Sequence, residues 1–369
     1  MTRSSTSSSS AWRRAIAPGA LALVMLLVVD TVLGTGTAAR WLASQVERGG
    51  RASFVTRLEG RLDDLASTPS DSPRVVVLGN SRAQAAIDPG GLGDVTVTVI
   101  ARPGIEPFQM RFYADRVART RPDVVVLAWS EFDTHRPIRL EPVSARAATS
   151  VPALLDLLRA TDARFAWENR DSLLRSAAAA TSNVYRYREV LGQAFGFAWR
   201  RFPLAANLTS PAPPPIAGRA RAALFDGEVR ALPDSTRRRL QRLFPERGIG
   251  MIFDQADMVS EIQPGRHVAV QRHLLRRAVE VLCGAGATVV VVETPIHPIT
   301  RGLYDTGLAT PFRAFVAELE RDLDVRFVPL GAAERFAAGD FLDLIHLDPS
   351  GRARLTARTR EAVRRALAE

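Results

Sequence analysis

The sequence predicts an α/β fold in which helices flank a doubly wound parallel sheet of about five strands. Short runs rich in β-branched residues, which are typical of buried strands, occur at 75–78, 95–100, 123–129, 287–293 and 325–329. Segments with helical spacing lie between or after these runs, at 107–120, 267–282, 305–322 and 352–369. This alternation favours parallel strands that are joined by crossover helices. The runs also end in residues suited to turns, as at Gly79 and Asn80.

The N-terminal segment predicts a membrane anchor. Residues 1–14 are polar and basic, whereas residues 15–29 carry no charge. Counted through Asp30, the stretch at 15–38 provides the roughly 20 residues that a helix needs to cross a bilayer. Arginines precede it, so the positive-inside rule places the tail at 1–14 in the cytoplasm and the rest of the chain outside. A signal peptide cleaved near Ala39 is the alternative, but this apolar stretch is longer than is usual for signal peptides.

The remainder of the chain predicts a linker followed by one large domain. A charged, amphipathic segment at 39–72 ends in a stretch rich in serine and proline, and we expect it to be a stalk and linker. The domain then spans 73–369, with a largely helical insertion at about 140–265 that breaks the alternation of strands and helices.

Within the predicted anchor, Asp30 is unusual, because a carboxylate within a membrane span is costly. Such a residue marks either a partner or a place near the membrane surface.

The charge, cysteine and histidine content of the chain argue against several classes of function. The formal net charge of the 369 residues is +10, and all 49 basic residues are arginines, spread along the chain among 39 acidic ones. No nucleic-acid-binding module accompanies this charge, so we expect no nucleic-acid partner. The single Cys283 excludes an internal disulfide. The histidines show no metal-ligand spacing, so no metal site is expected.

Two short motifs suggest a nucleophile and its base. Ser81 follows the strand at 75–78 after the turn residues Gly79 and Asn80, at the edge where α/β proteins bind ligands, although many serines at such turns only cap a helix. Near the C-terminus, Asp343 precedes His346 by three residues. One loop can therefore bring both groups to one site, where the carboxylate orients the imidazole toward a nucleophile. Serine, histidine and aspartate in these roles indicate acyl transfer through a covalent ester.

Together the two motifs resemble those of the GDSL/SGNH hydrolase family. The first block is matched by Gly79-Asn80-Ser81, and the last block by Asp343, His346 and Gly351. The resemblance covers roughly residues 71–135 and 266–369. It implies a flavodoxin-like sheet of the SGNH type and a catalytic triad of Ser81, His346 and Asp343 that needs no cofactor.

The resemblance also implies an oxyanion hole. In the family the donors are the backbone N–H of the serine, a glycine after the second strand and an asparagine after the third strand. The matching positions here are Ser81, Gly104 and Ser130. Ser130 has a shorter reach than the family's asparagine, which weakens the third donor. Because the carboxyl ends of the strands line the site, three further residues are candidates for substrate binding: Arg82, Glu131 and His297.

Membrane-anchored members of the family look most similar to this chain. They include the D-alanyl transfer protein of teichoic-acid modification and proteins of exopolysaccharide O-acetylation. This likeness implies an extracytoplasmic O-acyltransferase or esterase that acts on a cell-surface or exported polysaccharide, with a membrane-bound O-acyltransferase as its partner. A secreted carboxylesterase or lipase is one alternative. A non-catalytic glycan-binding scaffold that keeps the fold is another.

Overall fold

Five parallel strands form the centre of the structure, in the order β2–β1–β3–β4–β5. They are β1 (Arg74–Asn80), β2 (Thr96–Arg102), β3 (Val124–Trp129), β4 (Thr288–Glu293) and β5 (Arg326–Val328). The predicted α/β class and the five strands are therefore confirmed. The computed structural model describes residues 23–35, 37–38, 41, 51–67, 70–102, 105–135, 138, 150–188, 191, 238, 242, 267–302, 306–330 and 336–369.

The valine runs form strands because each of their side chains has an apolar partner on one face of the sheet or the other. Val77 of β1 lies opposite Val126 of β3, which in turn lies opposite Val290 of β4. All three are fully buried in the core beneath one face. Their neighbours Val76 and Val125 are buried in the core beneath the opposite face. Both faces are covered, so the strands read as continuous apolar runs without polar alternation.

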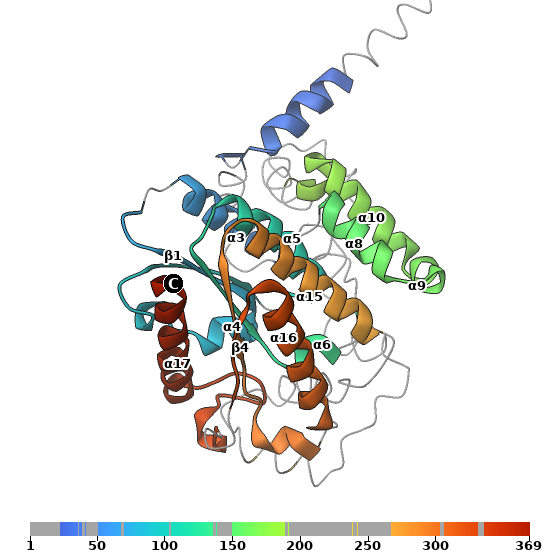
Figure 1. Ribbon diagram of the computed structural model, residues 1–369. Helices are drawn as coiled ribbons and strands as arrows, with labels where there is room; N and C mark the ends of the chain where they lie inside the picture. The colour runs from blue at the N-terminus through green and yellow to red at the C-terminus, as the bar shows by residue number, and fades with distance from the viewer. Residues whose placement is uncertain are drawn as a thin grey trace, which may run out of the picture.

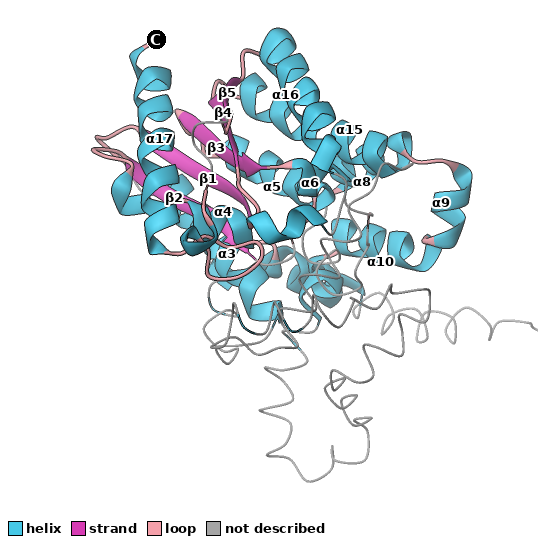
Figure 2. Cartoon of the chain, turned by 90° about the horizontal axis from the view of Figure 1, so that it is seen from below, coloured by secondary structure: helices cyan, strands magenta, loops and turns pink. Residues whose placement is uncertain are grey.

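Helices cover the two faces unequally (Figures 1 and 2). One core contains side chains of α3 (Arg51–Ser67), α5 (Pro107–Arg119), α15 (His267–Gly284) and α16 (Ala309–Leu323). The other core contains side chains of α4 (Ser81–Ala86) and α17 (Pro349–Ala368). The flanking helices thus lie where the sequence predicts them, between and after the strands.

The predicted insertion contributes further helices. These are α8 (Val151–Ala160), α9 (Ala163–Glu168) and α10 (Arg170–Thr181), and the short α6 (Glu131–His135) precedes them. Arg111 of α5 donates from Nε to Asp156 Oδ2 of α8 at 2.8 Å, and both side chains are buried. This ion pair joins the insertion to the core. Most of the expected insertion after 188 lies outside the described residues.

The segment expected to be a stalk contains a helix of the domain. Leu58, Leu62 and Leu65 of α3 are buried in the core, and Arg61 donates to the carbonyl of Val99 in β2 at 3.1 Å. The leucines follow helical spacing, so a single stripe of α3 faces the sheet. This part of 39–72 therefore belongs to the folded unit, and the sequence prediction of a stalk is corrected here.

The predicted anchor is described in part. Residues 23–33 form a helix, and residues 15–22 lie outside the described residues. In the part of the chain that the structure describes, no helix combines the length and the apolar character that crossing a bilayer requires.

The strand order sets the place where a ligand site is expected. The chain runs from β1 to β2 on one side and then to β3 on the other side of β1. In open α/β sheets, ligands bind outside the carboxyl ends of the strands at such a reversal. Ser81 follows the carboxyl end of β1, and Ser130 follows that of β3.

Gly79, the residue before the turn, allows α4 to pack closely on β1. A Cβ at this position would lie 2.6 Å from Cβ of Ala83. We therefore expect Gly79→Ala to lower the free energy of unfolding by about 1–3 kcal/mol, because the core there must be overpacked or shifted. Urea unfolding measures this difference. Gly284→Ala is the control, since nothing lies within 4 Å of its added Cβ; equal midpoints for both variants would contradict the prediction.

Candidate active site

Ser81 sits on a turn that is fixed on both sides. It is the first residue of α4 and follows β1 directly. Asn80 caps the helix, because its Oδ1 accepts a hydrogen bond from the backbone N–H of Arg82 at 2.9 Å. The amide Nδ2 of Asn80 also donates to Asp133 Oδ1 at 2.7 Å. The Ser81 side chain is held half-buried at the edge of the sheet.

A buried carboxylate organises the loop that carries the predicted base. Asp343 is only 2% exposed. Its Oδ1 accepts hydrogen bonds from the backbone N–H groups of Ile345 at 3.0 Å and His346 at 2.9 Å. Its Oδ2 lies 2.9 Å from His346 Nδ1. These donors replace the water that burial removes from the carboxylate.

The same loop is closed by backbone pairing and by a neighbouring segment. Phe341 and Leu347 form an antiparallel bridge, and Leu342 N–H donates to the carbonyl of His346 at 2.9 Å. From outside the loop, the backbone N–H of His297 donates to the carbonyl of Leu344 at 3.1 Å. The position of the imidazole is therefore set by the backbone as well as by Asp343.

The two predicted motifs meet in space. His346 Nε2 lies 3.0 Å from Ser81 Oγ, across a sequence separation of 265 residues. An ionised carboxylate only accepts hydrogen bonds, so Asp343 favours the tautomer in which Nδ1 carries the proton. Nε2 then faces the Ser81 hydroxyl as an acceptor. The arrangement is a chain of hydrogen bonds from a buried carboxylate through an imidazole to a hydroxyl. This is the geometry of an activated nucleophile with its general base.

The structure describes only two of the three predicted oxyanion donors, Ser81 and Ser130. Gly104 lies outside the described residues. Ser130 is fully buried, and its Oγ accepts hydrogen bonds from Arg82 Nη1 at 2.6 Å and from the backbone N–H of Phe132 at 3.1 Å. Its hydroxyl is thus engaged beneath the surface. The backbone N–H of Ser81 remains the candidate donor that the structure describes at the reacting residue.

The three predicted substrate-binding residues are placed inside the fold. Arg82 is 2% exposed and donates to Ser130, to the Thr294 side chain and to the Thr294 carbonyl at 3.1 Å. Glu131 is buried at the start of α6. His297 is buried, with its Nδ1 accepting from the backbone N–H of Ile299 at 3.1 Å and its ring edge-on to Phe341. Their described contacts support the loops around the site.

Sequence reasoning did not single out Asp133. Its carboxylate accepts from Asn80, from Arg82 Nη1 at 3.4 Å and from the backbone N–H of Ser130 at 2.9 Å. A signal was available, because a serine followed three residues later by an acid at the start of a helix is a capping pattern. The pattern predicts the contact with the Ser130 backbone, but it does not predict the contacts with Asn80 and Arg82.

The single cysteine lies outside the series of Asp343, His346 and Ser81, and burial lowers its reactivity. Burial raises the pKa of the Cys283 thiol to about 11, so this residue of α15 stays protonated at neutral pH. Among the residues that the structure describes, no group of three His, Cys, Asp or Glu side chains is arranged to hold a metal ion.

No family model matches this chain, and no curated protein matches it. The chemistry of the site therefore rests on the geometry described above and on the motif resemblance.

The buried guanidinium of Arg82 yields a stability prediction. Arg82→Met should lower the free energy of unfolding by about 3–5 kcal/mol, because it leaves Asp133 as a buried charge without its cation. Chemical denaturation measures the change. The control is Arg321→Met, whose side chain is 70% exposed and pairs with Asp322; we expect a change of less than about 1 kcal/mol there. Similar losses in the two variants would contradict a special role for Arg82.

Gly351 yields a prediction about the loop that carries Asp343 and His346. A Cβ at Gly351 would lie 2.4 Å from the carbonyl oxygen of Asp340. Gly351→Ala should push α17 away from the Asp343–His346 loop and lower stability by about 1–3 kcal/mol. Thermal melting measures the loss. Gly339→Ala lies in the same region with nothing within 4 Å of the new Cβ, and it should melt like the parent; a parent-like melt for Gly351→Ala would show that the loop has room.

Proposed function

We propose that this chain is an SGNH-type serine O-acyltransferase or esterase that acts outside the cytoplasm on a cell-surface or exported polysaccharide. The observation that carries the proposal is the hydrogen-bonded series from Asp343 through His346 to Ser81. The flavodoxin-like strand order supports it, because Ser81 follows β1 at the reversal of the sheet. The match of Gly79-Asn80-Ser81 and of Asp343, His346 and Gly351 to the family's blocks adds to this support.

In the first half of the proposed reaction, an acyl group moves to the enzyme. Ser81 Oγ attacks the carbonyl carbon of the acyl donor while His346 Nε2 takes the hydroxyl proton. The carbonyl oxygen becomes an oxyanion, which we assign to the backbone N–H of Ser81 and, following the resemblance, of Gly104. Collapse of this intermediate expels the donor's alcohol, which receives the proton from His346. Asp343 stabilises the imidazolium that forms in between.

In the second half, the acyl group leaves Ser81. His346 removes a proton from water or from a glycan hydroxyl, and the resulting oxygen attacks the ester carbonyl. Ser81 departs with the proton returned by His346. Release to water gives an esterase, and release to a sugar hydroxyl gives a transferase. The triad serves both outcomes, because they differ only in the second nucleophile.

The proposed location follows from the N-terminal segment. The apolar stretch at 15–38 would act as a signal anchor, with residues 1–14 in the cytoplasm and the catalytic domain on the other side. A membrane-bound O-acyltransferase that passes acyl groups outward would then be a suitable partner. A secreted esterase or lipase is the alternative for the same site.

The triad can be tested with a fluorophosphonate probe, which labels activated serines. We expect an adduct on Ser81, found by peptide mass spectrometry. Ser81→Ala should abolish this labelling, while His346→Gln and Asp343→Asn should slow it by at least about 10³-fold, because the general base or its orientation is lost. Ser67→Ala, at an exposed serine of α3, is the matched control and should label normally. Labelling of Ser81 that is independent of His346 would refute the triad, and an absence of labelling on Ser81 would favour a non-catalytic scaffold.

A second measurement separates transfer from hydrolysis. The full chain is incubated with an aryl acetate and a deacetylated acidic polysaccharide. We expect acetyl transfer to the polysaccharide to exceed the release of free acetate, and Ser81→Ala to stop both. Fast acetate release that is indifferent to the polysaccharide would assign the chain to the secreted esterases or lipases.

A further inference from the structure

The apolar helix at 23–33 is attached to the domain through Asp30. Asp30 Oδ1 accepts hydrogen bonds from Ser182 Oγ at 2.7 Å and from the backbone N–H of Val184 at 2.9 Å. Asn183 Nδ2 also donates to the Asp30 carbonyl at 3.1 Å. A carboxylate in an otherwise apolar segment is thus explained, because it bonds to polar groups that follow α10. The end of the helix has a defined place on the domain (Figure 1).

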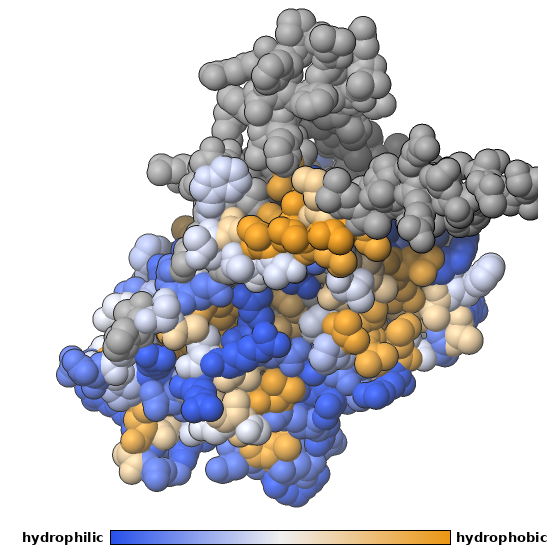
Figure 3. All heavy atoms as spheres, turned by 90° about the horizontal axis from the view of Figure 1, so that it is seen from above, coloured by the Kyte–Doolittle hydropathy of each residue, from blue (hydrophilic) through white to orange (hydrophobic). Residues whose placement is uncertain are grey.

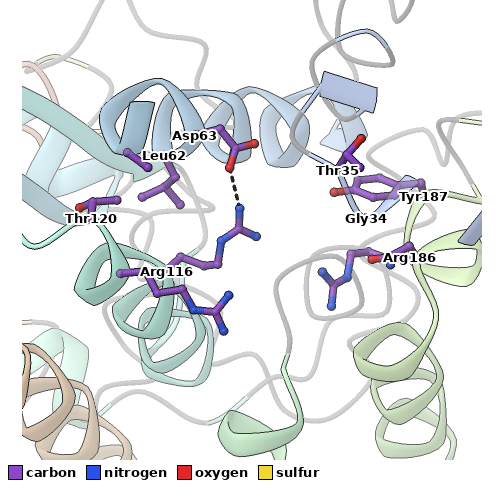
Figure 4. Close-up of a pocket in the computed structure, with 11 residues that line it drawn as sticks. Gly34, Thr35, Leu62, Asp63, Arg116, Thr120, Arg186 and Tyr187 are labelled. Carbon is purple, nitrogen blue, oxygen red and sulfur yellow. Dashed lines mark hydrogen bonds and ion pairs between the residues drawn. The ribbon is translucent and has the colours of Figure 1, made fainter. Parts of the chain in front are cut away.

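A pocket of about 370 Å³ lies at the foot of this helix. Its wall is built from four separate segments: the chain just after the apolar helix, α3, the last turn of α5 and the segment that follows α10. Figure 4 shows Arg116 and Arg186 on opposite sides of the space, with Thr35 and Tyr187 on the side of Arg186. These residues come from distant parts of the sequence, so the sequence alone gives no sign of the pocket.

The lining of the pocket is strongly basic. Arg116, Arg119 and Arg186 line it, against the single carboxylate of Asp63. Asp63 pairs with Arg116 at 3.2 Å, so the lining holds three arginines against one carboxylate. Arginine forks match phosphate oxygens in geometry. The chemistry suits a phosphate group better than a neutral or cationic one.

The surroundings indicate where such a phosphate comes from. Leu23 to Val29 of the apolar helix, which leads directly into the pocket-lining Gly34 and Thr35, are largely exposed. Basic side chains next to exposed apolar ones are typical of the lipid headgroup region. Seen from above (Figure 3), hydrophobic residues gather on this face among hydrophilic ones.

We propose that the pocket at the foot of the apolar helix binds the phosphate of an anionic phospholipid. This inference rests on the membrane location in the proposed function. Lipid binding there would hold the domain in a fixed orientation, because the pocket joins the apolar helix, α3 and α5 at one point. A free phosphate ion has the same oxygen chemistry but gains nothing from the apolar neighbours.

Native mass spectrometry of the full chain in detergent tests the pocket. Phosphatidylglycerol, phosphatidylcholine and inorganic phosphate are offered separately. We expect retention of phosphatidylglycerol to exceed that of phosphatidylcholine. Arg119→Gln, at an exposed residue of α5, should weaken retention about tenfold, since one charge-assisted hydrogen bond is lost. Arg321→Gln, outside the pocket and on α16, is the matched control and should bind like the parent.

Three outcomes overturn the proposal: equal retention of both lipids, retention that Arg119→Gln leaves unchanged, or binding of inorganic phosphate without lipid. Ser81→Ala should bind lipid normally, so failure of the catalytic proposal is measured separately. Flotation of the full chain with vesicles tests the anchor by itself. Retained phosphatidylglycerol in a chain that does not float would refute the anchor and still support the pocket.

Discussion

The buried guanidinium of Arg82 is the interaction on which the site depends. It bonds to groups at the ends of β3 and β4, while its own backbone belongs to the turn after β1. A buried cation is tolerated when a counter-charge is near and most of its hydrogen bonds are satisfied. Nη1 and Nη2 of Arg82 are bonded, whereas its Nε has no partner among the described residues. Asp133 supplies that charge and also holds Asn80. The residue next to Ser81 therefore fixes three strand ends relative to one another.

The base side of the site is held by a separate set of contacts. The loop that carries His346 is fixed by the Phe341–Leu347 bridge, by His297 from the segment after β4, and by α17 packing on Asp340 through Gly351. Neither set shares a residue with the other. The 3.0 Å contact between His346 and Ser81 is thus the meeting point of two independently supported loops.

The sequence predicts the strands well because each run is short, rich in valine and bounded by turn residues, which together favour a strand that is buried on both faces. It also brings Ser81, Asp343 and His346 together, since nucleophile and base have recognisable local patterns. The sequence does not predict where the side chains of Arg82 and His297 point. A polar residue after a strand can face a ligand or face neighbouring loops inside the fold, and residue spacing does not distinguish the two orientations. It fails for α3 in the same way: the stripe of Leu58 and Leu62 shows an apolar face but not its partner.

Rigid support on both sides has a consequence for the proposed chemistry. A nucleophile and base that are aligned before substrate binds require little reorganisation in the transition state. Ser130 is engaged with Arg82 below the surface, so in the proposed reaction the oxyanion would be stabilised mainly by backbone donors. Losing one oxyanion donor typically costs about 10²–10³ in turnover. In the proposed reaction, a weaker oxyanion site would slow transfer and hydrolysis alike, because both pass through a tetrahedral intermediate on Ser81. The choice between the two outcomes would then depend on how firmly a sugar hydroxyl is held beside the acyl group in competition with water.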